Sequence, residues 1–186
     1  MKKTAILFLT ASSLILTACS NTAMQEQNAD KTAMARNKVN FQLPPSQKWD
    51  LVSVEQDANG YAKSYRSVGA KGLSADQSFY INYGKNIRTP LLESMHEVVG
   101  SLASTGCKHT DAKRVKLDKN ILIFTASANQ CMSGRSISQT FKVFNMNDGQ
   151  YSIVYSANPN AVPNKTRQQM KSVVMNATIS PINGRA

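Results

Sequence analysis

The stretch ISQTFKVFNMNDGQYSIVYS, residues 137–156, decides the fold, because a turn joins two strand-like runs within it. The runs, residues 137–145 and 151–156, are rich in β-branched and aromatic residues, which favour strands. Between them lies Asn147-Asp148-Gly149, and these residue types accept the backbone geometry of a tight reversal. The stretch therefore predicts an antiparallel β-hairpin within a larger sheet.

Runs of the same kind predict further strands before this hairpin. Residues 49–54 and 61–65 flank Asn59-Gly60, another dipeptide that is typical of hairpin turns. Residues 78–83 alternate between apolar and polar side chains, as a strand with one buried face does. Two more strands are expected at residues 113–117 and 121–128.

Two segments have instead the apolar spacing of an amphipathic helix. The first begins at Thr89-Pro90, with Thr89 as its N-cap, and ends near Gly106; its apolar face comprises Leu91, Met95, Val98 and Leu102. The second is capped by Asn164, and its apolar face comprises Met170, Val173, Val174 and Ala177. The order of elements predicts an α+β fold, in which an antiparallel sheet of about six or seven strands packs against two helices.

The amino terminus has the pattern of an export signal. Lys2 and Lys3 precede a 12-residue apolar run, residues 5–16. This run is shorter than the roughly 20 residues that a transmembrane helix needs. Residues 1–18 are therefore predicted to be a signal peptide.

Leu16-Thr17-Ala18-Cys19 follows that run and resembles the lipobox of bacterial lipoproteins. The resemblance implies that the chain is cut before Cys19, whose sulfur then carries acyl chains such as palmitate and anchors the protein in a membrane. Ser20, which is not aspartate, implies transport to the outer membrane, with the domain facing the periplasm. The alternative is an ordinary signal peptide in which Cys19 is incidental.

The composition then divides the exported chain into two parts. Residues 19–40 are rich in Asn, Gln, Ala, Thr and Lys, which predicts a flexible tether behind the lipidated cysteine. A short helix is the competing interpretation of this segment. Residues 41–186 are expected to form one periplasmic α+β domain.

A second resemblance concerns that domain. The chain has Phe41-Gln-Leu-Pro44 at the start of the domain, then a helix in mid-chain and a meander of strands, and finally a closing strand followed by Pro163 and an amphipathic helix. In this order of elements it resembles the PsbP-like domains of bacterial envelope lipoproteins. The resemblance covers residues 41–180. It implies a binding or assembly module, and it carries over no catalytic residue.

Cys107 and Cys131 are the two cysteines that remain after Cys19. An even pair in an exported domain predicts a disulfide, because the periplasm is oxidising. Zinc is one alternative, since His96 and His109 are also zinc-type ligands, and a Cys/His nucleophile site is another. We expect the disulfide, and neither a metal site nor a catalytic residue.

The charge is strongly positive, with 22 Lys and Arg against 11 Asp and Glu, and a net charge of +11. The densest basic stretch, residues 108–119, predicts a basic patch formed by Lys108, Lys113, Arg114, Lys116 and Lys119. On a regular strand, Arg114 and Lys116 would share one side, while Val115 and Leu117 would face the core. Such a patch fits phosphates of lipid or lipopolysaccharide, an acidic protein, or simply a solubilising edge.

These features together predict a non-catalytic outer-membrane lipoprotein. The sequence contains no nucleophile elbow, metalloprotease helix, P-loop or dinucleotide fingerprint, and nothing in it implies a cofactor. We expect a binding or assembly module in an envelope complex, for which a secretion or conjugation system is one setting. The alternative is a binding module for anionic lipid, lipopolysaccharide or glycan; nucleic acid is a poor partner for an exported domain.

Overall fold

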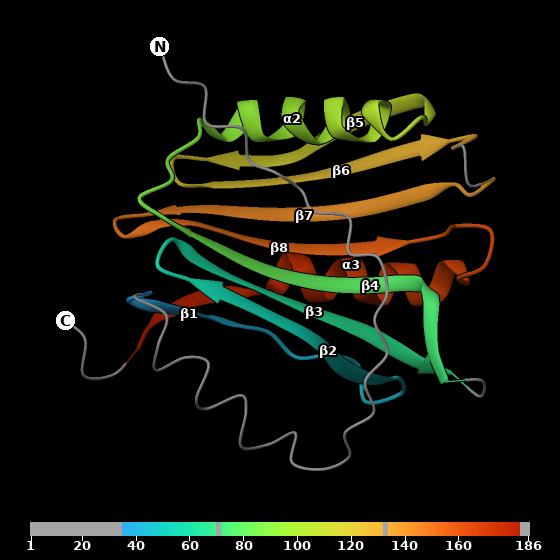
Figure 1. Cartoon of the computed structure of the whole chain (residues 1–186), viewed down its shortest axis with the longest axis horizontal. Coiled ribbons are helices and arrows are strands. Elements are labelled where there is room, and N and C mark those ends of the chain that lie inside the picture. The colour runs from blue at the N-terminus through green and yellow to red at the C-terminus, as the bar shows by residue number, and fades with distance from the viewer. Residues whose placement is uncertain (1–34, 70–71, 132–133, 183–186) are drawn as a thin grey trace.

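The computed structural model describes residues 35–69, 72–131 and 134–182, so the predicted signal peptide, Cys19 and most of the predicted tether lie outside the described residues. Its main element is a seven-stranded antiparallel sheet with the strand order β2-β3-β4-β8-β7-β6-β5 (Figure 1). The strands are β2 (Lys48–Asp57), β3 (Gly60–Gly69), β4 (Gly72–Lys85), β5 (Lys108–Asp118), β6 (Ile121–Asn129), β7 (Ile137–Met146) and β8 (Gly149–Ala157).

Two helices cover opposite faces of this sheet, α2 (Leu91–Ser104) in front and α3 (Asn164–Asn176) behind in Figure 1. Leu91 and Leu102 of α2 pack in one apolar cluster with Phe124 and Phe141. A second cluster lies on the α3 side; its fully buried members include Phe79, Tyr151, Ile153, Met170 and Val174. The sheet and its two helices confirm the α+β fold expected from the sequence.

Both predicted hairpins are confirmed. The turn Asn147-Asp148 joins β7 to β8, and the turn Ala58-Asn59 joins β2 to β3. In the second turn the Asp57 carboxylate accepts hydrogen bonds from the backbone N–H groups of Asn59, at 2.7 Å, and Gly60, at 3.0 Å.

The starts of the two helices differ by one residue from the sequence prediction. Pro90, rather than Thr89, is the N-cap of α2, and its carbonyl accepts the N–H groups of Glu93 and Ser94. The Thr89 carbonyl is instead bound by the side-chain amides of Asn145 and Gln150, which hold it outside the helix. Pro163 likewise takes the cap position that the sequence assigned to Asn164.

A small ladder outside the main sheet corrects the predicted boundary of the tether at residue 40. β1 (Asn37–Asn40) pairs antiparallel with β9 (Thr178–Pro181), and Ala35 is buried, with 1% of its surface exposed. The Asp148 carboxylate accepts hydrogen bonds from the backbone N–H of Arg36, at 2.8 Å, and from the Asn37 amide, at 3.1 Å. The domain therefore includes residues 35–40, because the β7–β8 turn and β9 hold them.

Candidate functional site

A polar groove lies between α3 and the outer strands on the same face of the sheet. Its volume is about 210 Å³. The lining residues come from α3 and from four adjacent strands: Asp111, Thr125, Ala126, Ser127, Ser138, Thr140, Tyr155, Arg167, Gln168 and Lys171. The groove exists because α3 contacts β7 and β8, so that, among the described helices, none covers the side chains of β5 and β6 on this face.

The floor of the groove consists of hydroxyl side chains that strand register brings into two rows. Thr140 of β7 lies opposite Thr125 of β6, and Ser138 of β7 lies opposite Ser127 of β6. Residues in register across an antiparallel pair point to the same face, so all four hydroxyls share one surface. Asp111 of β5 extends the serine row by one strand.

Two basic side chains of α3 form the wall of the groove. Arg167 and Lys171 are four positions apart, so they lie one turn apart on the same side of the helix. The Arg167 side chain donates from Nε to the Val162 carbonyl at 3.2 Å, which holds the guanidinium in place. In the described ranges neither Arg167 nor Lys171 pairs with a carboxylate, so this wall keeps its positive charge.

Tyr155 of β8 lies where the groove meets the core. Its hydroxyl donates to the Gln77 side-chain oxygen at 3.0 Å. Burial raises the pKa of Tyr155 to about 12, while the nearby positive charge of Arg167 acts in the opposite direction. The phenol is therefore uncharged at neutral pH and contributes an apolar ring and a neutral hydroxyl group.

The lining of the groove is chemically suited to binding. Asp111 is its one carboxylate, and the lining includes neither histidine nor cysteine. Two cations, four hydroxyls and one carboxylate are well placed to recognise an anionic, hydroxyl-rich ligand.

The predicted basic patch lies along β5 and the turn that follows it. Its five members, Lys108, Lys113, Arg114, Lys116 and Lys119, are all exposed. The expected alternation is wrong, however, because the strand register shifts between Arg114 and Lys116. Arg114 lies opposite Phe124 and Lys116 opposite Ile123, and consecutive residues of a strand point to opposite faces. The bulge therefore places Arg114 and Lys116 on different sides of the sheet.

The apolar residues of β5 are also more exposed than expected. Val115 is 42% exposed and Leu117 is 41% exposed, because β5 is the edge strand of the sheet. Lys116 forms an ion pair with Asp118 at 2.7 Å. Lys113 is in register with Thr125, which places it on the groove side of β5.

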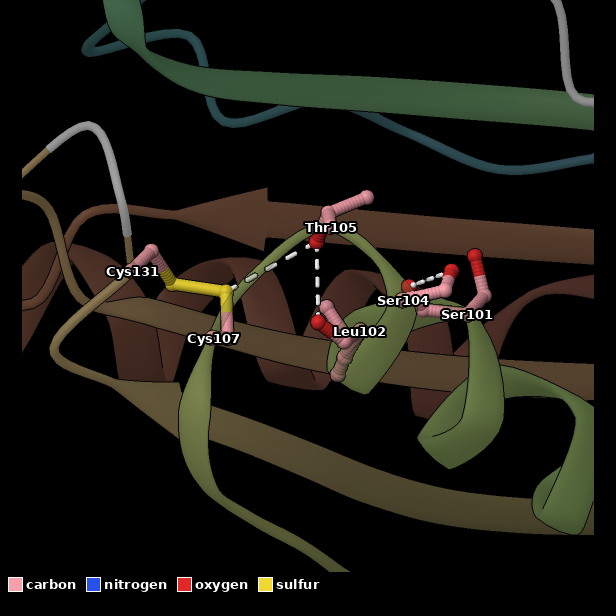
Figure 2. The surroundings of a disulfide bond; sticks show 6 residues. All are labelled: Ser101, Leu102, Ser104, Thr105, Cys107 and Cys131. Carbon is pink, nitrogen blue, oxygen red and sulfur yellow. Dashed lines mark hydrogen bonds between the residues drawn. A yellow bond between two sulfur atoms is a disulfide. The ribbon is translucent and has the colours of Figure 1, made fainter.

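Cys107 and Cys131 form a disulfide, as the sequence predicts (Figure 2). The bond joins the segment after α2 to the segment after β6, and both cysteines are buried. The Thr105 hydroxyl lies 3.7 Å from the Cys107 sulfur and donates to the Leu102 carbonyl at 2.8 Å. Both sulfurs belong to the disulfide, so neither is a thiolate. The zinc site and the Cys/His nucleophile site would each have required a thiolate.

The two histidines are separate surface residues, His96 on α2 and His109 on β5. Within residues 35–69, 72–131 and 134–182, no group of three or more His, Cys, Asp or Glu side chains is placed to hold a metal ion. None of the helices in the described part of the chain is long and apolar enough to span a membrane.

The sequence interpretation did not identify the groove. Two signals for it were present: the spacing of Arg167 and Lys171 on a helix, and the alternation of hydroxyl residues in β6 and β7. The helix residues follow the hydroxyl residues of β7 by about 30 positions and those of β6 by about 40, and only strand register and the placement of α3 bring them together.

Comparisons with known proteins give one distant similarity. No protein-family model matches the chain, and no match was found among curated proteins. Among solved structures, LpqN of Mycobacterium tuberculosis, which is involved in cell envelope biogenesis, matches with a TM-score of 0.45 and 10% sequence identity. The match covers 81% of this chain and 87% of LpqN.

Proposed function

We propose that this chain is an outer-membrane lipoprotein, anchored through Cys19, whose periplasmic domain is a non-catalytic binding module for another component of the cell envelope. The groove beside α3 supports this proposal. It is concave and open, and Arg167 and Lys171 form its wall above a floor of hydroxyl groups. Its partner is either a protein subunit, as in a secretion or conjugation assembly, or an anionic lipid, lipopolysaccharide or glycan.

The groove is a better candidate for the contact surface than the basic strand β5. The basic residues of β5 are exposed, and its bulges direct neighbouring side chains to different faces. Lysines and bulges are also the devices by which edge strands avoid pairing with other chains. Most of the groove residues, in contrast, lie on the paired strands β6, β7 and β8 and on a helix packed against the sheet, so regular elements hold them in place.

In-cell photo-crosslinking tests the groove as the contact surface. A photoreactive residue at Gln168, which lines the groove, is compared with the same residue at Gln169, which is exposed and does not line it. We expect position 168 to give a specific adduct that position 169 does not give. Mass spectrometry of the adduct then separates a protein partner from a lipid or glycan. Identical adducts at both positions, or none at position 168, would contradict the groove as the binding surface.

The anchor is tested by the variant Cys19→Ser, which removes the sulfur that accepts the lipid. Acyl chains contribute roughly 0.8 kcal/mol per buried CH₂, and two chains are enough for stable anchoring. We expect the wild-type protein in the outer-membrane fraction and the variant in the soluble periplasmic fraction. A variant that still sediments with membranes after a high-salt wash would show that lipid is not the anchor.

A further inference from the structure

We infer that the groove beside α3 binds a single sugar unit that carries one anionic group, either a carboxylate or a phosphate. This inference rests on the proposed binding function and names the class of ligand for the same site. It is carried by three observations: the paired cations of the wall, the hydroxyl rows of the floor, and the size and polarity of the space between them.

The wall is arranged to hold one anionic group. Side chains four positions apart on a helix have Cβ atoms about 5–6 Å apart. Arg167 and Lys171 both line the groove, so one anionic group there can contact both side chains. Arginine binds a carboxylate or phosphate through two parallel N–H groups, and lysine adds a compact charge. The contact of Arg167 Nε with the Val162 carbonyl leaves the far end of the guanidinium directed away from that carbonyl.

The floor is arranged to hold sugar hydroxyl groups. Thr125, Ser127, Ser138 and Thr140 each provide one hydroxyl group. The Thr125 hydroxyl donates to the Lys113 carbonyl at 3.5 Å, which leaves its oxygen to accept a hydrogen bond from a ligand. Asp111, at the end of the serine row, can accept a hydrogen bond from a ligand hydroxyl. A sugar ring, which presents several such groups in fixed directions, is complementary to this surface.

The size and polarity of the groove argue against a lipid chain as the occupant. Its volume of about 210 Å³ is below the roughly 300–1,000 Å³ of sites that enclose a drug-sized ligand. An acyl chain placed on the floor would also deprive the threonine and serine hydroxyls of water without giving them a hydrogen-bond partner. The polar part of an envelope glycan or of a glycolipid is therefore the better occupant.

Ligand binding to the mature lipoprotein in an uncharged detergent tests the inference. Four probes are titrated by isothermal titration calorimetry: a glucuronate disaccharide, glucose 6-phosphate, neutral maltose and inorganic phosphate. We expect one or both of the anionic sugars to bind more tightly than maltose and inorganic phosphate. Preference for glucuronate would indicate a carboxylated glycan as the source of the ligand, and preference for glucose 6-phosphate would indicate a phosphorylated sugar of a glycolipid.

Matched variants of α3 connect that binding to the groove. Arg167→Gln and Lys171→Gln should each weaken binding of the anionic sugar about tenfold, because each removes a charge-assisted hydrogen bond. Lys171→Arg should restore most of the affinity. Lys165→Gln makes the same charge change on the solvent side of α3 and should leave the affinity unchanged. Circular dichroism of each variant confirms that its fold is intact.

Several outcomes would overturn the inference. These are equal binding of maltose and the anionic sugars, binding of inorganic phosphate as tight as that of the sugars, no binding at all, or equal losses in all three Gln variants. If position 168 still gave a groove-specific crosslink alongside any of these results, the proposed binding function would stand. Only the sugar would be rejected as its ligand.

Discussion

Lys142 of β7 is a lysine in the core of a basic protein, with 8% of its surface exposed. Its ammonium donates to the carbonyls of Met175 and Ala177, both at 2.7 Å, at the carboxyl end of α3. The same group lies 5.1 Å from the centre of the Phe144 ring. Burial lowers the pKa of Lys142, and the charge of Lys116 acts in the same direction. The residue binds the end of α3 to the sheet at the cost of placing a charge inside the protein.

We expect Lys142→Met to lower the free energy of unfolding by about 1–3 kcal/mol, because one buried and one partly buried hydrogen bond to carbonyl groups are lost. Denaturant unfolding followed by circular dichroism measures this change. Lys165→Met, at an exposed position of α3, is the matched control and should change stability by less than about 0.5 kcal/mol. A Lys142→Met variant as stable as the wild type would contradict this prediction. It would show that the free-energy cost of burying the ammonium equals the gain from its two hydrogen bonds.

Tyr155 makes stability depend on pH in the alkaline range. Its pKa is raised from the ordinary value of 10.0 to about 12, mainly by burial. Above pH 10 the unfolded chain therefore loses the phenol proton more readily than the folded chain, so this residue's contribution to stability falls between pH 10 and 12. Burial also raises the pKa values of Tyr83 and Tyr151, so the phenolate absorbance of the folded protein should show one fewer late-titrating tyrosine in Tyr155→Phe than in the wild type. A variant and a wild type with the same titration curve would contradict this assignment.

At the scale of single elements, the β7–β8 hairpin joins the two ends of the domain. Its turn residue Asp148 accepts a hydrogen bond from the Tyr151 hydroxyl at 2.6 Å, in addition to those from Arg36 and from Asn37 of β1. The Tyr83 hydroxyl donates to the Asp148 carbonyl at 3.0 Å. Gly149 completes the turn with a φ of 151°, and a Cβ there would clash with the Gly84 carbonyl oxygen.

Gly149→Ala should therefore destabilise the protein by about 1–3 kcal/mol, because the turn and β4 leave no room for a methyl group. Gly100→Ala is the matched control, since Gly100 lies within α2 and a Cβ there would meet nothing within 4 Å. Alanine in a helix is favoured over glycine, so the control should raise stability by about 0.5–1 kcal/mol. Thermal unfolding of both variants measures these opposite changes, and a shift of the same sign in both would reject the argument.

At the scale of the whole molecule, the two helices are placed on opposite faces and over different strands. α2 contacts β5 and β6, whereas α3 contacts β7 and β8. On the α3 face the outer strands β5 and β6 are therefore left beside the helix instead of beneath it. This offset creates the groove. The disulfide of Cys107 and Cys131 joins the segment after α2 to the end of β6.

Loss of that disulfide should affect the stability of the whole domain. The two cysteines are separated by 24 positions, and closing a loop of this size contributes roughly 3 kcal/mol through the reduced entropy of the unfolded chain. We expect the double variant Cys107→Ser and Cys131→Ser to unfold at lower denaturant, at the same midpoint as reduced wild type. If oxidised wild type unfolded at the same denaturant midpoint as the double variant, this expectation would be contradicted. Mass spectrometry after alkylation without reductant should find neither of these two thiols labelled.

Much of this architecture was predictable from local patterns. Period-two alternation, hairpin dipeptides and helical spacing indicated all seven strands of the main sheet and both helices, and the pairing of Cys107 with Cys131 followed from the number of cysteines. The β1–β9 ladder was not predicted, because two strands of four residues carry little pattern and pair across most of the chain. The bulge in β5 was also missed, since nothing in the spacing of Arg114 and Lys116 marks a change of register.

The elements of this protein follow from its sequence, because helices and strands depend on the spacing of apolar residues and on turn chemistry between close neighbours. The groove depends on tertiary structure, because strand register and helix placement bring together residues that are distant in the chain. Thr125, Ser138 and Arg167 show the difference: each is an ordinary polar residue in its own segment. They share one surface because β6 pairs with β7 and because α3 packs over β7 and β8 and not over β6.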